Sequence, residues 1–441
     1  MGENTVKEKQ QDKRTIRRKR RIRNQIISYV ALAVVLLLVV IGIVIAVNYI
    51  SKHVENSRSS EEEVKSQVDQ ILSNEPEISQ PDPSDYVPEL TPEEKLDEII
   101  NAAIDVMPLE DKVAGLFVVT PEAITGVNTA VKAGESTKEA LSKNAVGGLI
   151  YFQKNMKSAD QLKEMINNSV LYSRYPLFVG VDEEGGTVAR VASSGLAKDV
   201  GTAASIGATG DPANAYAAGQ AIGTYLTEFG FNLNFAPVAD LNNVDNSIIG
   251  DRSYGSDPAV VAQMVASVIK GLEEKGVSAC MKHFPGIGSS TQDTHNGLAS
   301  TDRAAEDFRV GEFVVFQSGI ESGVDFIMIT HMAAPNLSGN QDPCTFSEEV
   351  VTNILRKELG YDGVVITDAL NMKAISEYNS SEEAAIKALK AGCDMLLMPE
   401  DYQEAYEGVL QAVKDGTISE QRINDSLLRI YRIKYAGMLK E

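Results

Sequence analysis

The 441-residue chain has no tryptophan, only three cysteines and only four histidines. The cysteines, Cys280, Cys344 and Cys393, are odd in number, which excludes a disulfide framework as the main source of stability. Cys280 and Cys393 lie in apolar runs, where a thiol behaves as a small hydrophobic side chain. Cys344 lies in a loop with no neighbouring base to activate it. A folded domain in this chain must therefore depend on its hydrophobic core.

Charge is absent between Asn24 and Ser51, and apolar residues fill the stretch from Ile26 to Ile50 almost without interruption. At ~1.5 Å per residue this stretch reaches roughly 37 Å, enough to cross a hydrocarbon layer of about 30 Å. Residues 1–25 carry ten Lys/Arg against three Asp/Glu, which predicts a cytoplasmic N-terminus. No signal-peptide cleavage site is evident. We therefore expect a retained single-pass anchor in the cell membrane, with the remainder extracellular, and no nucleic-acid binding by the basic segment.

The acidic remainder of the chain, which brings the net charge to −21, divides into two parts. Residues 51–91 are rich in Glu, Ser, Asp and Pro, a composition typical of a flexible, solvated stalk. At Thr91 the pattern changes to a helix start, with proline in the first helical position and acids in the first turn. We expect one folded domain over residues 92–441.

Short apolar runs alternate with helical patterns along this domain. The expected strands are residues 113–120, 147–152, 176–182, 233–240, 278–284, 326–332, 363–370 and 393–399. Helical patterns between them include residues 213–229, 258–275, 350–359 and 381–391. Nearly continuous apolar runs are typical of strands buried on both faces. Eight such strands separated by helices predict an α/β fold, a single (β/α)8 TIM-type barrel. A doubly wound open sheet is the alternative, but no GxGxxG motif follows a strand.

Polar side chains concentrate where these strands end, which is where a barrel of this kind builds its active site. They are Asp182, Glu183, Glu184, Arg190, Asp240, Asp251, Arg252, Lys282, His283, Asp293, His295, His331 and Asp368. Any one of them has a structural alternative, as a helix cap or an ion pair at the barrel rim. Asp240 reads well as part of a turn, and a solvated position is the simplest interpretation of Glu183 and Glu184. The set as a whole favours a functional site.

The loop that follows the fifth strand, KHFPGIGSSTQDTH, holds two of the four histidines within fourteen residues. Its proline and glycines prevent regular structure, and loops that concentrate titratable groups usually act on a ligand. Zinc coordination by His283, Asp293 and His295 is chemically possible, but the spacing matches no common zinc motif. We therefore predict neither a metal nor an organic cofactor.

The chain resembles the bacterial β-N-acetylglucosaminidases of glycoside hydrolase family 3 over roughly residues 92–441. Five motifs carry the resemblance and occur in the family's order: DEEGGTVAR, NLNFAPVADL, IGDRSYGSDP, KHFPGIGSSTQDTH and ITDALNM. The KHFPG…D-[S/T]-H element is the most specific, because it distinguishes this branch from the β-glucosidases. The resemblance implies a retaining exo-enzyme that releases terminal N-acetylglucosamine from peptidoglycan fragments or chito-oligosaccharides.

The resemblance also implies roles for individual residues. Asp368 matches the catalytic nucleophile, and His295 matches the acid/base, held by Asp293. The sugar-binding positions are matched by Asp182, Arg190, Arg252, Lys282 and His283. The chain departs from many relatives at Ile287, where histidine is common, and at Ala369, where an acid is frequent. Neither position carries the chemistry.

Two other functions remain open at this stage. A histidine acid/base has been linked to phosphorolysis, because phosphate approaches a neutral imidazole more easily than a carboxylate. A catalytically inactive wall-binding module is the other alternative, although such a module has no need to keep Asp368, Asp293 and His295. The absence of tryptophan argues against an extended aromatic-lined cleft and agrees with a small pocket. We expect a monomer whose partners are the glycan and the membrane.

Overall fold

The computed structural model describes residues 90–245, 247–292 and 297–436. The chain divides into two units, residues 1–89 and residues 90–441, and the structural description concerns the second. The expected membrane span at residues 26–50 and nearly all of the expected stalk therefore lie outside the described residues. Within the described ranges, no helix combines the length and the apolar character needed to cross a bilayer.

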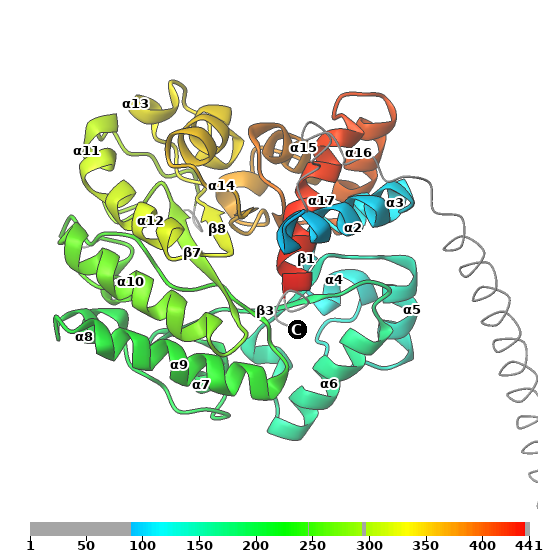
Figure 1. The fold of residues 1–441 in the computed structure, drawn as a ribbon, viewed down its shortest axis with the longest axis horizontal. Coiled ribbons are helices and arrows are strands. Elements are labelled where there is room, and N and C mark those ends of the chain that lie inside the picture. The colour runs from blue at the N-terminus through cyan, green and yellow to red at the C-terminus, as the bar shows by residue number, and fades with distance from the viewer. Residues whose placement is uncertain (1–89, 246, 293–296, 437–441) are drawn as a thin grey trace, which may run out of the picture. The chain divides into compact units, whose positions relative to one another are not determined.

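Eight parallel strands form the centre of this unit and confirm the predicted α/β barrel (Figure 1). The strands are β1 (Phe117–Val119), β2 (Gly148–Tyr151), β3 (Phe178–Val181), β6 (Leu233–Asn234), β7 (Ser278–Phe284), β8 (Phe326–Ile329), β9 (Val364–Thr367) and β10 (Leu396–Leu397). Each pairs with its neighbour in chain order, and β10 pairs with β1. A parallel bridge between Ile366 and Met395 joins β9 to the start of β10 and closes the barrel. A short antiparallel hairpin, β4 (Glu183–Gly185) with β5 (Val188–Ala189), follows β3.

Each expected strand contains an observed strand, but several are shorter than predicted. Val113 and Ala114 belong to a helix rather than to the first strand. The predicted strand at residues 233–240 is regular only at Leu233 and Asn234. Beyond them the chain stays buried and still bonds to β7, since Ala239 N donates to Lys282 O at 2.6 Å. Pro237 lacks an N–H, so this segment cannot continue a regular ladder.

Helices surround the strands (Figure 1). They are α2 (Pro92–Asp105), α3 (Leu109–Ala114), α4 (Pro121–Thr125), α5 (Glu135–Lys143), α6 (Ala159–Tyr172), α7 (Arg190–Ser193), α8 (Ala203–Gly207), α9 (Pro212–Phe229), α10 (Pro258–Glu273), α11 (Ala305–Val310), α12 (Glu312–Glu321), α13 (Pro335–Ser338), α14 (Lys373–Ser376), α15 (Ser381–Ala391), α16 (Tyr402–Lys414) and α17 (Glu420–Tyr435). Short 3-10 turns are η2 (Gln153–Asn155), η3 (Gly250–Arg252) and η4 (Cys344–Phe346).

Local sequence signals explain several helix boundaries. Thr91 caps α2 through a capping box with Glu94, which confirms the predicted start of the folded domain's first helix. Ser380 and Gly392 bracket α15, whose bounds agree with the prediction. The predicted helix at residues 350–359 is a π-type helix, η5 (Glu349–Glu358).

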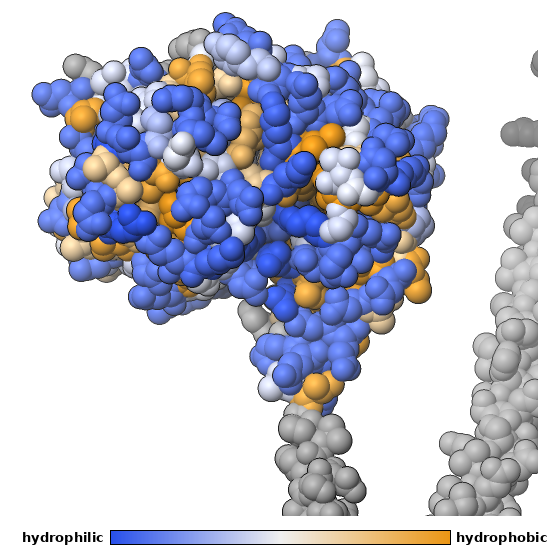
Figure 2. Space-filling model, turned by 90° about the horizontal axis from the view of Figure 1, so that it is seen from above, coloured by the Kyte–Doolittle hydropathy of each residue, from blue (hydrophilic) through white to orange (hydrophobic). Residues whose placement is uncertain are grey.

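One continuous apolar core fills the barrel and the layer between strands and helices. All three cysteines are free and buried in it, Cys344 included. Hydrophilic side chains dominate the molecular face drawn in Figure 2, and apolar residues appear there in small, separated groups. The folded unit therefore takes its stability from this core and not from disulfide bonds.

Candidate active site

A cavity of about 340 Å³ opens at the carboxyl ends of the barrel strands. It is lined by Glu184 and by six of the eight residues to which the resemblance gives roles, namely Asp182, Arg190, Arg252, Lys282, His283 and Asp368. Two further predicted residues, Asp293 and His295, lie outside the described residues. The remaining walls are mainly apolar and include Ile150, Phe152, Ile248, Met328, Met372 and Met398. A small chamber with polar groups converging on one side is typical of a ligand site.

Strand β7 contributes two consecutive side chains, Lys282 and His283, to this cavity. In a regular strand, neighbouring side chains point to opposite faces. The pairing of β7 with β8 shifts register between Lys282 and Phe284, so the alternation is interrupted at this point. The irregularity brings an ammonium group and an imidazole to the same wall.

Lys282 stands between two carboxylates. Its Nζ lies 3.0 Å from Asp182 Oδ1 and 2.7 Å from Glu184 Oε1. Burial alone would lower the pKa of Lys282, but Asp182 and Glu184 raise it above its ordinary value. The Lys282 side chain is therefore a buried, charged ammonium group at the wall of the cavity.

Glu184 also forms an ion pair with Arg252, a second cation of the site. Arg252 donates to it from both Nε and Nη2, each at 2.8 Å, in a bidentate pair. Burial opposes ionisation of Glu184, but Lys282 and Arg252 together lower the pKa of Glu184 to about 2. The expectation that Glu183 and Glu184 are solvated is wrong, because both residues are less than a tenth exposed.

Asp240 orients His283. Its Oδ2 lies 2.7 Å from His283 Nδ1, and its Oδ1 accepts the Ile287 N–H at 2.7 Å. A carboxylate beside Nδ1 accepts a hydrogen bond from that nitrogen and so fixes the orientation of the imidazole ring. Asp240 is fully buried, so it is an internal support of the site and not merely the turn residue that its sequence context suggested.

Asp368 follows β9 and is partly exposed to the cavity. Its N–H donates to Ile329 O at 2.9 Å, and one carboxylate oxygen accepts the Ala369 N–H at 2.7 Å. Burial would raise the pKa of Asp368, but the nearby rings of His331 and His283 outweigh it, and the pKa is lowered. Asp368 is thus an ionised carboxylate aimed into an enclosed space.

His331, which the sequence placed at the end of the sixth strand, supports the neighbouring backbone. Its Nε2 donates to Ala369 O at 3.0 Å, and its Nδ1 lies 2.9 Å from Thr345 Oγ1. It is fully buried beneath the loop that carries Asp368. His331 therefore fixes the backbone on the C-terminal side of that carboxylate.

Sequence reasoning missed the contributions of Glu184 and Asp240. A usable signal existed for Glu184, because it stands two residues after Asp182 in extended chain and so shares its side of the strand. For Asp240 the usable signal was its position directly after a buried apolar segment. Its partner, His283, lies 43 residues later, and only the fold brings the two together.

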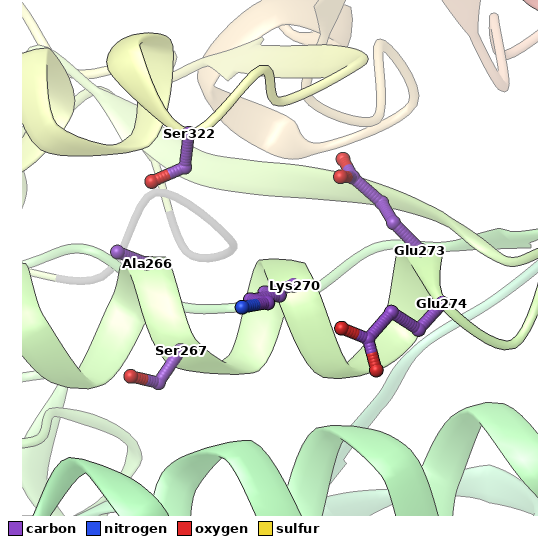
Figure 3. A pocket seen from close by; sticks show the side chains of 6 residues that line it. All are labelled: Ala266, Ser267, Lys270, Glu273, Glu274 and Ser322. Atoms are coloured by element: carbon purple, nitrogen blue, oxygen red, sulfur yellow. The ribbon is translucent and has the colours of Figure 1, made fainter.

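A larger hollow, about 580 Å³, lies on the outside of the barrel (Figure 3). Its lining comes from α10, from the residue directly after it and from the residue after α12, and consists of Ala266, Ser267, Lys270, Glu273, Glu274 and Ser322. In Figure 3 these side chains fan outwards and do not converge on a common point. We therefore assign the candidate active site to the smaller cavity at the strand ends. No group of three or more His, Cys, Asp or Glu side chains suited to a metal ion occurs among the described residues.

Residues 108–433 match the sequence family described as the glycosyl hydrolase family 3 N terminal domain. The chain is 32% identical over 326 residues to beta-hexosaminidase A of Pseudoalteromonas piscicida, covering 67% of this chain and 54% of that protein. It is 34% identical over 295 residues to a beta-hexosaminidase of Idiomarina loihiensis, covering 66% of this chain and 88% of the relative. The chain thus spans about half of one relative and most of the other.

Solved structures give the same result. A glycoside hydrolase family 3 beta-N-acetylglucosaminidase from a Paenibacillus species superposes with a TM-score of 0.70 at 34% sequence identity. The match covers 76% of this chain and 64% of that structure. The barrel of this chain therefore resembles that of a solved glycoside hydrolase family 3 structure, over about three quarters of this chain and about two thirds of that one.

Proposed function

Because the chain belongs to glycosyl hydrolase family 3 and to its β-N-acetylhexosaminidases, we propose that it removes terminal β-linked N-acetylglucosamine through a covalent glycosyl-enzyme. The observation that carries this proposal is the ionised Asp368 carboxylate, which faces a one-sided array of cations and hydrogen-bonding groups. Such an array can hold a sugar ring in a fixed orientation beside a nucleophile.

In the proposed first step, a carboxylate oxygen of Asp368 attacks the anomeric carbon, and the bond from that carbon to the leaving oxygen breaks. The leaving oxygen takes a proton from the acid/base, the role that the sequence resemblance gives to His295 with Asp293 behind it. In the second step the acid/base takes a proton from a water molecule, and the water oxygen attacks the anomeric carbon. The bond from that carbon to Asp368 breaks, and the configuration is retained.

The cavity walls suit recognition of sugar hydroxyl and acetamido groups. Asp182 supplies acceptor oxygens, and Lys282, Arg190 and Arg252 supply charged donors around the same space. His283 adds a ring nitrogen whose orientation Asp240 fixes. A volume of about 340 Å³ is at the small end of ligand sites. This favours one terminal sugar in the cavity and hence exo-action.

We also propose the location and the natural glycans expected from the sequence. The uncharged apolar stretch from Ile26 to Ile50 and the basic residues before it support a cell-membrane anchor with an extracellular catalytic domain. Peptidoglycan fragments or chito-oligosaccharides would then be the accessible substrates, acted on by a monomer. Protease treatment of intact cells tests the topology, since an extracellular domain is digested without lysis, and light scattering of the purified protein tests the monomer.

The enzymatic test compares the full chain with Asp368→Asn on a chromogenic β-N-acetylglucosaminide and on the matching β-glucoside. We expect turnover of the N-acetyl sugar only, and its loss in the variant with unchanged circular dichroism. A parallel assay with added phosphate distinguishes hydrolysis from phosphorolysis, because only phosphorolysis yields the sugar 1-phosphate. No turnover by folded wild-type protein under either condition would contradict the proposal and favour an inactive binding module.

A further inference from the structure

Glu183 stands between two residues that line the cavity, yet it points to the other side of the chain. Asp182 and Glu184 contact Lys282 inside the site, whereas the Glu183 side chain is fully buried and does not line the cavity. Extended chain alternates its side chains in this way. Glu183 is therefore a buried acid directly behind the wall that holds the proposed sugar-binding groups.

Three donors converge on the two carboxylate oxygens of Glu183. Val191 N–H donates to Oε2 at 2.7 Å, and Ala192 N–H donates to Oε1 at 2.9 Å. The Tyr225 hydroxyl, from α9, also donates to Oε1 at 2.9 Å. Burial raises the pKa of Glu183, and these three hydrogen bonds act against that rise, because an ionised carboxylate accepts hydrogen bonds and donates none.

The main chain of Glu183 is fixed as firmly as its side chain. Asn234, in β6, accepts the Glu183 N–H at 3.0 Å and donates its amide to Glu183 O at 2.9 Å. Asn234 is fully buried. Glu183 therefore connects a barrel strand, through its own backbone and carboxylate, to the backbone that begins α7.

The residue at the start of α7 is Arg190, one of the cations of the cavity. Its Nη2 lies 3.7 Å from Asp182 Oδ2, a distance too long for a hydrogen bond. Its Nε is buried, and it has no hydrogen-bond partner in the described part of the chain. The guanidinium otherwise lies 5.8 Å from the centre of the Phe152 ring. Its side-chain contacts alone therefore hold it weakly, and its position depends on the backbone that carries it.

We propose that Glu183 is a positioning residue for the reaction, because its carboxylate fixes the first turn of α7 and thereby aims Arg190 at the bound sugar. This inference rests on the proposed function, in which Arg190 is a donor to the substrate. A Glu183→Gln substitution keeps the size of the side chain but turns an amide NH2 towards at least one of the three donors. We expect KM to rise about tenfold, the loss that fits one charge-assisted hydrogen bond, with kcat within about twofold of wild type.

A double-mutant cycle with Arg190→Ala tests whether Glu183 acts through Arg190. We expect Arg190→Ala to lower kcat/KM by more than Glu183→Gln does, and the double variant to match Arg190→Ala alone. Tyr225→Phe, which removes one of the three donors and leaves the carboxylate, should raise KM by about threefold. It supplies a second measurement if Glu183→Gln folds poorly.

The chain provides a matched control on the same helix. Tyr216, in α9, donates its hydroxyl to Glu274 at the protein surface, and Tyr216→Phe removes the same kind of hydrogen bond away from the cavity. We expect no change in KM for this variant. Two results would overturn this inference and leave the proposed function intact. One is that the losses from Glu183→Gln and Arg190→Ala are additive, and the other is that KM is unchanged in Glu183→Gln. Arg190→Ala with wild-type KM would also overturn this inference and leave the proposed function standing. Wild-type protein without glycosidase activity would overturn the proposed function and this inference with it.

Discussion

The Glu184→Gln variant tests the electrostatic account of the site most directly. Glu184 and Lys282 form a 2.7 Å ion pair in which the side chains are only 4% and 3% exposed, so solvent screens the pair little. Lys282 and Arg252 lower the pKa of Glu184 from 4.5 to about 2 despite burial. At 1.36 kcal/mol per pKa unit, this shift corresponds to about 3 kcal/mol of folding free energy at neutral pH. We expect Glu184→Gln to lower the free energy of unfolding by this amount.

The pH dependence of that loss has a definite sign. Because the pKa is lower in the folded protein, the stabilisation is fully present above the unfolded value near 4.5 and disappears as pH falls towards 2. The difference between wild type and Glu184→Gln should therefore be about 3 kcal/mol at pH 7 and only about 1.5 kcal/mol at pH 3. Urea unfolding followed by circular dichroism at the two pH values measures both differences.

A second ion pair of the same length, but exposed to solvent, is a control for the effect of burial. Glu139 and Lys143 form a pair of the same length, 2.7 Å, but their side chains are 69% and 68% exposed on α5. Glu139→Gln should leave both unfolding curves unchanged, since exposed ion pairs contribute little. If Glu184→Gln lost the same free energy at pH 3 as at pH 7, the loss would come from packing, and the electrostatic reasoning would be refuted.

Three other variants test the remaining parts of the structure. Asp368→Asn should lower kcat by about 10⁴-fold without changing the circular dichroism spectrum, because an amide cannot replace the carboxylate nucleophile; residual activity within tenfold of wild type would exclude that role. Asp240→Asn should lower kcat/KM at least about tenfold, because an amide in place of the carboxylate weakens the contact that fixes the orientation of His283; an unchanged kcat/KM would contradict this. Asp394→Asn should destabilise the barrel by about 3 kcal/mol or more in denaturant titrations while leaving KM unchanged, because the fully buried Asp394 carboxylate pairs with Arg356, Arg422 and Arg429.

The barrel could be predicted from the sequence because its strands are marked by local composition. Residues 364–366 are a continuous apolar run, and α15 has a serine cap before it and a glycine after it. The strand predicted at residues 233–240 was too long, because apolar character reports burial and not hydrogen-bond pattern. Pro237 interrupts the ladder while the segment remains in the core.

The candidate site was predictable as a set of strand-end residues but not as a network. Polar groups at the carboxyl ends of barrel strands meet at the same end of the barrel. This rule correctly predicted that Asp182, Lys282 and Asp368 lie close together. Which carboxylate oxygen meets which cation depends on positions far apart in the chain, as with Glu184 and Arg252 or Asp240 and His283. The roles of Asp293 and His295 stay predictions, because these residues lie outside the described part of the chain.

The alternation at Asp182, Glu183 and Glu184 has a consequence for how this segment tolerates change. Asp182 and Glu184 face the cavity and pair with Lys282, whereas Glu183 points away from the cavity and accepts a hydrogen bond from the backbone of α7. Deleting or inserting a single residue ahead of them would exchange the two sides, because the period of extended chain is two. One carboxylate would then face Lys282. Two carboxylates would point to the opposite side, where the backbone of α7 and Tyr225 supply hydrogen-bond donors for only one. The segment should therefore accept exchanges of side chain far more readily than any change in length.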